Sequence, residues 1–245
     1  MKLGILLCDD VRSELQIRHN NYPEMFSDIL LGADPALELV FYRVMDNQLP
    51  ASFNECDAYI GSGSKYSVYD DIPWIHHLAQ FVRDLYQHNI PFVGVCFGHQ
   101  MIAHALGGTV VKSENGWGVG LKTWSLVANK QWMQSDQTVE EKNTFSLAVS
   151  HQDQVTDLPD DAEILASSNF CPHAMIQVGQ HFLGIQGHPE FTSNYSRDLM
   201  IARRGDIPAY VIEAAKASLD QYIDQAEVTQ WMLEFIKVSI SRVPN

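Results

Sequence analysis

The sequence predicts an α/β fold, with a mostly parallel sheet flanked by helices and continued by an antiparallel extension. Through the first half of the chain, short apolar segments rich in β-branched residues alternate with helix-like segments, a pattern typical of parallel sheets. After Gly107–Gly108, strand-like segments follow one another with few gaps long enough for a helix. From Thr192 onward the apolar spacing is helical again. The 245 residues, 46% of them hydrophobic, are expected to form one domain.

The first half supplies the predicted parallel strands and the helices between them. The predicted strands are Leu3–Leu7, Leu37–Tyr42, Ala58–Gly61 and Phe92–Val95. A helix is predicted from Pro23 to Leu31 and a stronger one from Pro73 to His88, because each has a proline at its first turn. The second carries an apolar stripe at spacings of three and four: Ile75, Leu78, Phe81, Val82 and Leu85.

The second half supplies the predicted antiparallel extension and the C-terminal helices. Strands are predicted at Thr109–Val111, Gly120–Val127, Phe145–Val149, Ile164–Ala166, Ala174–Val178 and Phe182–Gln186. The polar segment Ala128–Asn143 is predicted to be a loop or the end of a hairpin. Residues 191–245 are predicted to be helices that cover the core.

The composition disfavours several classes of function. The formal net charge of −14 repels nucleic acids and anionic membrane surfaces, so neither is an expected partner. No apolar run approaches the length of a membrane span, and the N-terminal run is too short for a signal peptide. The four cysteines are scattered, with neither a disulfide framework nor zinc-site spacing. These features indicate a cytoplasmic protein without a metal site.

The first candidate for chemistry is Cys96. The segment Ile90–Gly108 is typical of a buried strand, a tight turn, a helix and a glycine stop, with Cys96 at the turn. Gly94 and Gly98 permit the close approach of strand and helix that a nucleophile elbow needs. A thiol near a helix N-terminus is favoured as thiolate, and the N–H of Phe97 would face an oxyanion formed on the attacked carbon. A structural core cysteine is the alternative interpretation.

The second candidate is the pair His188 and Glu190. Both follow a short apolar strand, and side chains two residues apart on extended backbone share a face. Pro189 biases His188 toward an extended conformation, so the carboxylate is expected beside the imidazole. A nucleophilic cysteine needs a base and a group that orients that base, and this pair supplies both. The alternative is that His188 is a surface-loop histidine.

Together, Gly94–Val95–Cys96–Phe97–Gly98–His99–Gln100 and Gly187–His188–Pro189–Glu190 resemble the two signatures of the class I glutamine amidotransferase family. His188 lies 92 residues after Cys96, which is the spacing of that family. The resemblance spans residues 1–190 and implies a flavodoxin-like sheet and a triad of Cys96, His188 and Glu190. We therefore predict one domain of 245 residues, with a catalytic core of residues 1–190.

Further segments fit the same resemblance. The segment from Ile60 to Asp70 resembles the oxyanion loop of the family, which maps onto Gly63 or Ser64. Ser64–Lys65 stands where the family usually has Gly–Pro, so either Gly63 or Ser64 is expected to donate the second N–H. Gln100 is a candidate for binding the glutamyl part of the substrate or for capping the helix. Ser150–Asp153 resembles a segment that lines the family's site, which gives His151 a supporting or structural role.

The resemblance implies a hydrolytic activity that needs no cofactor. The expected reaction is cysteine-dependent hydrolysis of the γ-amide of glutamine through a γ-glutamyl thioester. Family members pass the ammonia to a synthetase, so an ammonia-accepting protein partner is conceivable, although only 55 residues follow Glu190. One alternative is a γ-glutamyl peptidase acting on glutathione-like compounds. A second alternative is a non-catalytic regulatory or interaction protein.

Overall fold

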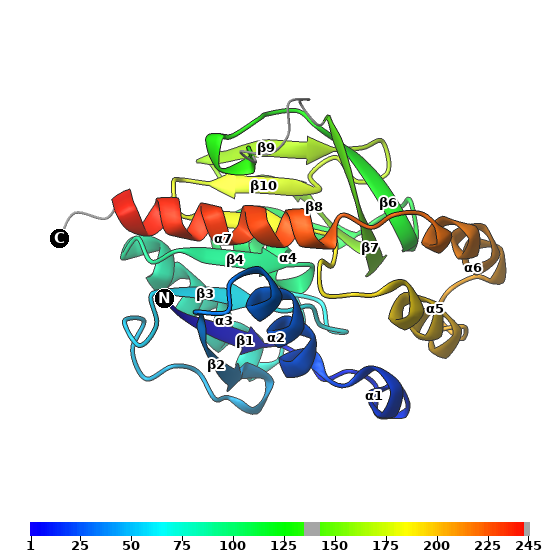
Figure 1. Cartoon of the computed structure of the whole chain (residues 1–245), viewed down its shortest axis with the longest axis horizontal. Coiled ribbons are helices and arrows are strands. Elements are labelled where there is room, and N and C mark those ends of the chain that lie inside the picture. Colours follow the sequence, from blue (N-terminus) through cyan, green and yellow to red (C-terminus); the bar gives the residue numbers. More distant parts are fainter. Residues whose placement is uncertain (135–142, 243–245) are drawn as a thin grey trace.

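A nine-stranded mixed sheet forms the centre of the protein in the computed structural model, which describes residues 1–134 and 143–242 (Figure 1). The strand order is β2-β1-β3-β4-β11-β10-β9-β6-β7. The first five strands of this order are parallel to one another, and the strands from β10 to β7 pair antiparallel. The parallel half has the 2-1-3-4-5 order of flavodoxin-like folds, with β11 as its fifth strand.

The strands have the following bounds: β1 Lys2–Leu7, β2 Glu38–Arg43, β3 Ala58–Gly61, β4 Phe92–Val95, β5 Thr109–Lys112, β6 Gly118–Leu126, β7 Thr144–His151, β8 Asp153–Asp157, β9 Ala162–Ser167, β10 Met175–Val178 and β11 Phe182–Ile185. The helices are α1 Ser13–His19, α2 Tyr22–Ala33, α3 Pro73–Gln87, α4 Phe97–Ala105, α5 Ser193–Ala202, α6 Ala209–Lys216 and α7 Gln225–Arg242. Three short 3₁₀ turns are η1 Val44–Asp46, η2 Gln131–Met133 and η3 Ala217–Asp220.

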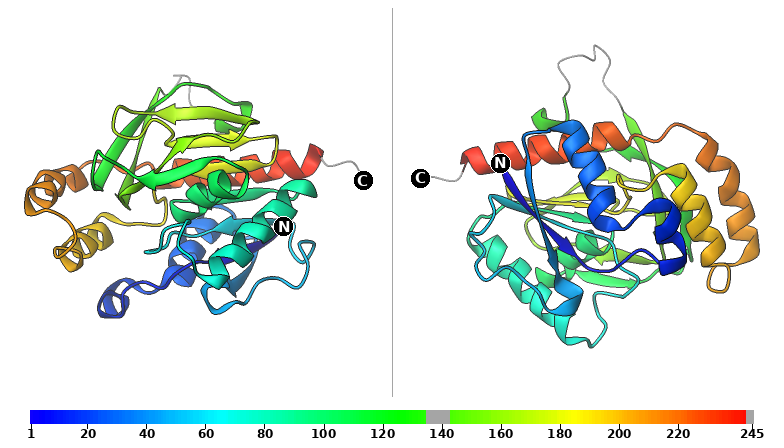
Figure 2. Two further views of the ribbon diagram at one scale, coloured as in Figure 1. Left: turned by 180° about the vertical axis from the view of Figure 1, so that it is seen from behind. Right: turned by 60° about the horizontal axis from the view of Figure 1, so that its bottom comes forward.

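Helices cover both faces of the sheet and divide the core into layers. On one face α2 and α7 lie side by side, and the core there includes Ile5, Phe26 and Phe235 (Figure 1). On the other face α3 and α4 cover the sheet, with Tyr59 and Phe92 in the core between them (Figure 2). A smaller apolar cluster joins α5 and α6 to β6. The strands β3, β4 and β11 are buried along their whole length, as expected for strands between two helical layers.

The predicted parallel core is confirmed, and the antiparallel half differs in one respect. The segment predicted as strand Thr109–Val111 forms β5 but does not extend the main sheet. Instead β5 pairs with β8 in a separate two-stranded sheet that packs on α4. The sequence did not reveal β8 or α1, because both are short and polar. In the segment Ala128–Asn143, residues 131–133 form a 3₁₀ turn, and residues 135–142 lie outside the described residues.

The C-terminal segment is helical as predicted, and α7 buries its apolar side in the core. Trp231, Met232, Phe235 and Ile236 are all at most 4% exposed. Within the described residues, no helix has the length and apolar character needed to cross a lipid bilayer. The division into a core of residues 1–190 and a C-terminal segment within one domain stays a prediction.

Candidate active site

Cys96 occupies a strained turn between β4 and α4. Its φ of 53° and ψ of −96° lie in a region that residues with a side chain rarely adopt. Two backbone hydrogen bonds hold this conformation: the N–H of Cys96 donates to the carbonyl of Ile185 at 2.8 Å, and its carbonyl accepts from Gln100 at 3.0 Å. The thiol is 5% exposed and lines a cavity. The turn therefore projects a single, nearly buried thiol from the N-terminus of a helix.

Glycines allow strand and helix to meet at this turn. A Cβ on Gly94 would lie 2.3 Å from the carbonyl of Gly98, and a Cβ on Gly98 would lie 2.6 Å from the carbonyl oxygen of Gly61. The N–H of Gly98 donates to the carbonyl of Ser62 at 3.2 Å, which ties α4 to the loop after β3. The two glycines predicted from the elbow pattern are therefore required by contacts between main chains.

His188 and Glu190 are paired as the sequence predicts. Nδ1 of His188 lies 2.7 Å from Oε1 of Glu190, and both side chains are at most 3% exposed. Since the carboxylate can only accept, Nδ1–H donates to it. The N–H of His188 donates to the carbonyl of Ala148 at 2.9 Å, which anchors the turn to β7. The carboxylate thus fixes the imidazole, whose other nitrogen is directed to Cys96.

Aromatic packing holds the imidazole in one plane. The ring of Phe191 stacks on His188 with 3.7 Å between ring centroids and 6° between planes. Phe191 in turn contacts Tyr22 of α2 and the edge of Tyr195 of α5. The histidine is therefore fixed both by a hydrogen bond at its edge and by a face contact.

The pKa of His188 is raised from 6.5 to about 10. Burial acts in the opposite direction, because it disfavours the charged ring. Two neighbours outweigh that cost: the negative charge of Glu190 and Cys96, which contributes both its charge and a hydrogen bond. An imidazolium beside a cysteine is the arrangement that stabilises a thiolate and can later release a proton to a leaving group.

The loop after β3 brings Gly63 against the imidazole. A Cβ on Gly63 would lie 2.7 Å from Cε1 of His188, so only glycine fits there without displacing the ring. Within residues 1–134 and 143–242, the backbone N–H groups of Gly63, Ser64 and Phe97 have no hydrogen-bond partner. All three predicted oxyanion donors therefore have a free N–H beside the site.

The departure from the usual family loop has a local explanation. The hydroxyl of Ser64 donates to the carbonyl of Cys8 at 3.0 Å and accepts from the N–H of Tyr66. Lys65 bonds through both its backbone N–H and its ammonium to the carboxylate of Asp9, each at 2.9 Å. These bonds to the segment after β1 fix a loop that has no proline.

Gln100 and His151 both contact the backbone of Asp153. Nε2 of Gln100 donates to this carbonyl at 2.8 Å, and Nδ1 of His151 lies 3.1 Å from it. Burial lowers the pKa of His151 to about 4, so this ring is neutral. Because the carbonyl only accepts, Nδ1 carries the proton of His151. Both predicted residues lie at the cavity, where they meet on one carbonyl.

Two residues at the site were not identified from the sequence. Nε2 of Gln186 lies 3.5 Å from Sγ of Cys96, and its place two residues before His188, on the same face of an extended segment, is the signal that could have revealed it. The second residue is Arg203, whose guanidinium donates to the carbonyl and hydroxyl of Ser150. Its guanidinium lies over the ring of Trp117 at 5.9 Å.

The cavity at Cys96 has a volume of about 810 Å³. Its inner wall is formed by Cys96, Gln100 and His151. Charged side chains from several segments also line the cavity: Asp9, Asp10, Arg12, Lys65, Lys112, Asp153, Arg203 and Asp206. Among the residues that the structure describes, no group of three or more His, Cys, Asp or Glu side chains could hold a metal ion.

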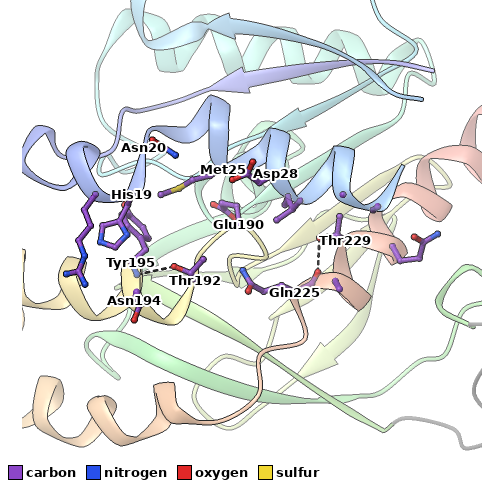
Figure 3. A pocket seen from close by; sticks show the side chains of 16 residues that line it. His19, Asn20, Met25, Asp28, Glu190, Thr192, Asn194, Tyr195, Gln225 and Thr229 are labelled. Atoms are coloured by element: carbon purple, nitrogen blue, oxygen red, sulfur yellow. Dashed lines mark hydrogen bonds between the residues drawn. The ribbon is translucent and has the colours of Figure 1, made fainter. Parts of the chain in front are cut away.

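A second cavity, of about 870 Å³, lies between α2, α5 and α7 (Figure 3). Glu190 lies at its wall, between Met25 and Asp28 of α2 on one side and Thr192 on the other. Gln225 of α7 holds the loop that contains Glu190, because its amide donates to the carbonyls of Pro189 and Phe191 at 2.7 and 2.9 Å. The carboxylate of Glu190 is thus held in a loop that is tied to the C-terminal helix.

The fold and the site's geometry define a class: α/β proteins that carry a reactive side chain on a strand-to-helix turn beside a histidine–carboxylate pair. A match to the family glutamine amidotransferase class-I covers residues 38–205. The chain belongs to this family. Its members are cysteine-dependent enzymes, so the chain is an enzyme of that kind.

Three similar proteins illustrate the relationship. The chain is 34% identical to gamma-glutamyl peptidase 3 of Arabidopsis thaliana over 61% of each chain. It is 27% identical to gamma-glutamyl peptidase 4 of the same plant over 93% of this chain and 90% of that one. A glutamine amido transferase of Methylobacillus flagellatus has the same fold, with a TM-score of 0.75, 20% identity and coverage of 98% and 94% of the two chains.

Proposed function

We propose that the protein hydrolyses the γ-glutamyl C–N bond of small molecules, with Cys96 as nucleophile, His188 as acid and base, and Glu190 as the group that orients His188. The observation that carries this proposal is the convergence of the three side chains in one buried site that opens to a cavity. A structural core cysteine would have no need of a positive φ or of an imidazolium partner. The same convergence argues against a non-catalytic role.

The reaction divides into two steps. The thiolate of Cys96 attacks the γ-carbonyl carbon, and the N–H groups of Phe97 and of Gly63 or Ser64 hold the resulting oxyanion. The C–N bond breaks as His188 gives a proton to the leaving amine, which leaves a γ-glutamyl thioester. Water then adds to the thioester while His188 takes its proton. The C–S bond breaks, and glutamate leaves with the enzyme restored.

The leaving group distinguishes the two substrate classes. Glutamine releases ammonia, whereas a γ-glutamyl peptide such as glutathione releases a peptide amine. The cavity of about 810 Å³ and the similarity to two peptidases along this chain favour the peptide. Because the chain belongs to the glutamine amidotransferase family, glutamine is the second candidate substrate. With glutamine as substrate, an ammonia-accepting protein would be the expected partner.

Separate incubation with glutathione and with glutamine tests both candidates. We expect glutamate and cysteinylglycine from glutathione, and little ammonia from glutamine. Cys96→Ser should abolish product, while Cys56→Ser, a buried cysteine in another part of the core, should retain it. Ammonia from glutamine without products from glutathione would reverse the order of the candidates. Equal product from wild type and Cys96→Ser would refute the nucleophile.

A further inference from the structure

We propose that Gln186 is a catalytic residue that holds the thiolate of Cys96 by donating an amide N–H to its sulfur. The proposal rests on the proposed function, since it concerns the same nucleophile. Nε2 of Gln186 lies 3.5 Å from Sγ of Cys96, within the range of an N–H···S hydrogen bond. Gln186 is completely buried, so no water competes for this bond.

A chain of hydrogen bonds fixes which end of the Gln186 amide faces the sulfur. The chain begins at the carbonyl of Asp153, which can only accept, so the atom of Gln100 at 2.8 Å from it is the NH₂ nitrogen. The same nitrogen lies 3.2 Å from the Gln186 amide and therefore meets its oxygen. The NH₂ of Gln186 is then the end directed at Cys96. A flipped amide would place one NH₂ against another and an oxygen against the thiolate.

The backbone holds both residues in place. The N–H of Cys96 donates to the carbonyl of Ile185, and the N–H of Gln186 donates to the carbonyl of Ala174, each at 2.8 Å. The nucleophile and the amide are therefore attached to adjacent strands, β4 and β11, at the same level of the sheet. Little rearrangement is needed for the amide to follow the sulfur during the reaction.

The sulfur thus has two donors of different character. His188 supplies a charge that is given up when the leaving group takes its proton. Gln186 supplies a neutral donor that persists through every step and does not titrate. Two titratable side chains interact electrostatically with Cys96: His188, which is hydrogen-bonded to Glu190, and Cys171. We therefore predict that Gln186 stabilises the thiolate that is released when the thioester is hydrolysed.

The competing interpretation is that Gln186 is a buried amide that only completes the packing. The two differ in the pH dependence of Cys96. A hydrogen bond to a charged group corresponds to a change of about one to two pH units in titration. Gln186→Met keeps the approximate volume and removes the donor. In the full chain, we expect the midpoint of the iodoacetamide labelling profile of Cys96 to rise by about one pH unit.

Gln177→Met is the matched control. Gln177 lies on β10, is 6% exposed and donates its amide to the carbonyl of Gly179, away from Cys96. This variant should label with the wild-type profile. Cys96→Ser provides the blank for labelling at other cysteines, and thermal melting of each variant reports whether it is folded.

Gln186→Glu provides a second test that keeps the shape and the acceptor for Gln100. An ionised carboxylate beside the sulfur opposes the thiolate, so the midpoint should rise at least as far as in Gln186→Met. Wild-type profiles in whichever variants fold would overturn the role of Gln186. The proposed function fails in a different way, if Cys96 of the wild type is labelled no faster than Cys8, Cys56 and Cys171.

Discussion

At the scale of single residues, the site is built around the imidazole of His188. Glu190 holds its Nδ1, Phe191 covers its face and Gly63 leaves room at its Cε1. Each contact constrains a different degree of freedom of the ring. Because the ring is buried, substitutions of the side chains that contact it are expected to change both its pKa and its position.

The charge on His188 links stability to pH. The pKa of His188 in the folded protein, about 10, lies above its ordinary value of 6.5. Protonation therefore stabilises the folded state, fully below pH 6.5, and this contribution is lost as the pH rises through 10. Glu190→Gln lowers the folded-state pKa. We expect urea denaturation to give wild type a larger free energy of unfolding than the variant at pH 6.5, and this difference should be smaller at pH 10. A difference that does not change with pH would contradict the proposed effect of the His188 charge on stability.

Gly63→Ala tests the space at the imidazole. The added Cβ lies 2.7 Å from Cε1 of His188, so the ring must shift from its position between Glu190 and the stacked Phe191. A displaced base should slow hydrolysis and Cys96 alkylation about tenfold to a hundredfold. Gly32→Ala on α2, where a Cβ meets nothing within 4 Å, is the control. It should keep full rates and gain about 0.5–1 kcal/mol of stability. Equal rates in both variants would count against the proposed role of the ring.

At the scale of elements, the start of α2 organises one wall of the cavity. Asn21 forms a capping box with Glu24, and its side chain also accepts from the N–H of Val11 and donates to Asp10. Asp10 in turn forms a two-pronged ion pair with Arg43 of β2. One cap therefore fixes the helix and also the loop after β1, which bonds to Ser64 and Lys65 in the loop after β3.

Asn21→Ala should therefore cost more than the loss of an ordinary helix cap. We expect a loss of about 2 kcal/mol in urea unfolding, at the upper end of the range for N-caps. Thr192→Ala is the comparison, because its hydroxyl makes a single capping bond to Tyr195 at the start of α5. It should lose about 1 kcal/mol. A smaller loss for Asn21→Ala than for Thr192→Ala would show that the loop does not depend on the cap.

At the scale of the whole molecule, α7 completes the fold although it follows the site in sequence. It lies across the sheet beside α2 and buries a row of large side chains (Figure 1). Gln225 at its start also holds the loop that carries Glu190. The C-terminal helix therefore belongs to the core and to the support of the site.

Truncation of Met232 tests this role. Met232 is fully buried in the core cluster shared by α7, α2 and the sheet. Met232→Ala should destabilise the protein by about 2–5 kcal/mol through the cavity it leaves. Gln230→Ala, two residues earlier and on the exposed side of the helix, should change stability by less than about 0.5 kcal/mol. The midpoint of urea unfolding measures both. Equal small changes would mean that α7 packs only loosely.

Local patterns in the sequence were sufficient for the parallel core, the elbow at Cys96 and the pairing of His188 with Glu190. In each case the partners are adjacent in sequence or alternate with regular spacing, so short-range geometry defines them. Gly94 and Gly98, for example, could be predicted because strand and helix must meet at one turn. The histidine pair could be predicted because positions two apart on extended backbone share a face.

Only the tertiary structure determined which distant residues meet at the site. Gln186 faces Cys96 because β4 and β11 are neighbours in the sheet, and Arg203 reaches Ser150 because α5 folds back against β7. The place of β5 was likewise determined only by the tertiary structure, because β5 pairs with β8 in a separate sheet and not with the main one. Such contacts depend on the arrangement of whole elements, which no local spacing encodes. The elbow at Cys96 and the pairing of His188 with Glu190 are thus specified by local sequence, whereas the groups that contact and enclose them depend on packing between remote segments.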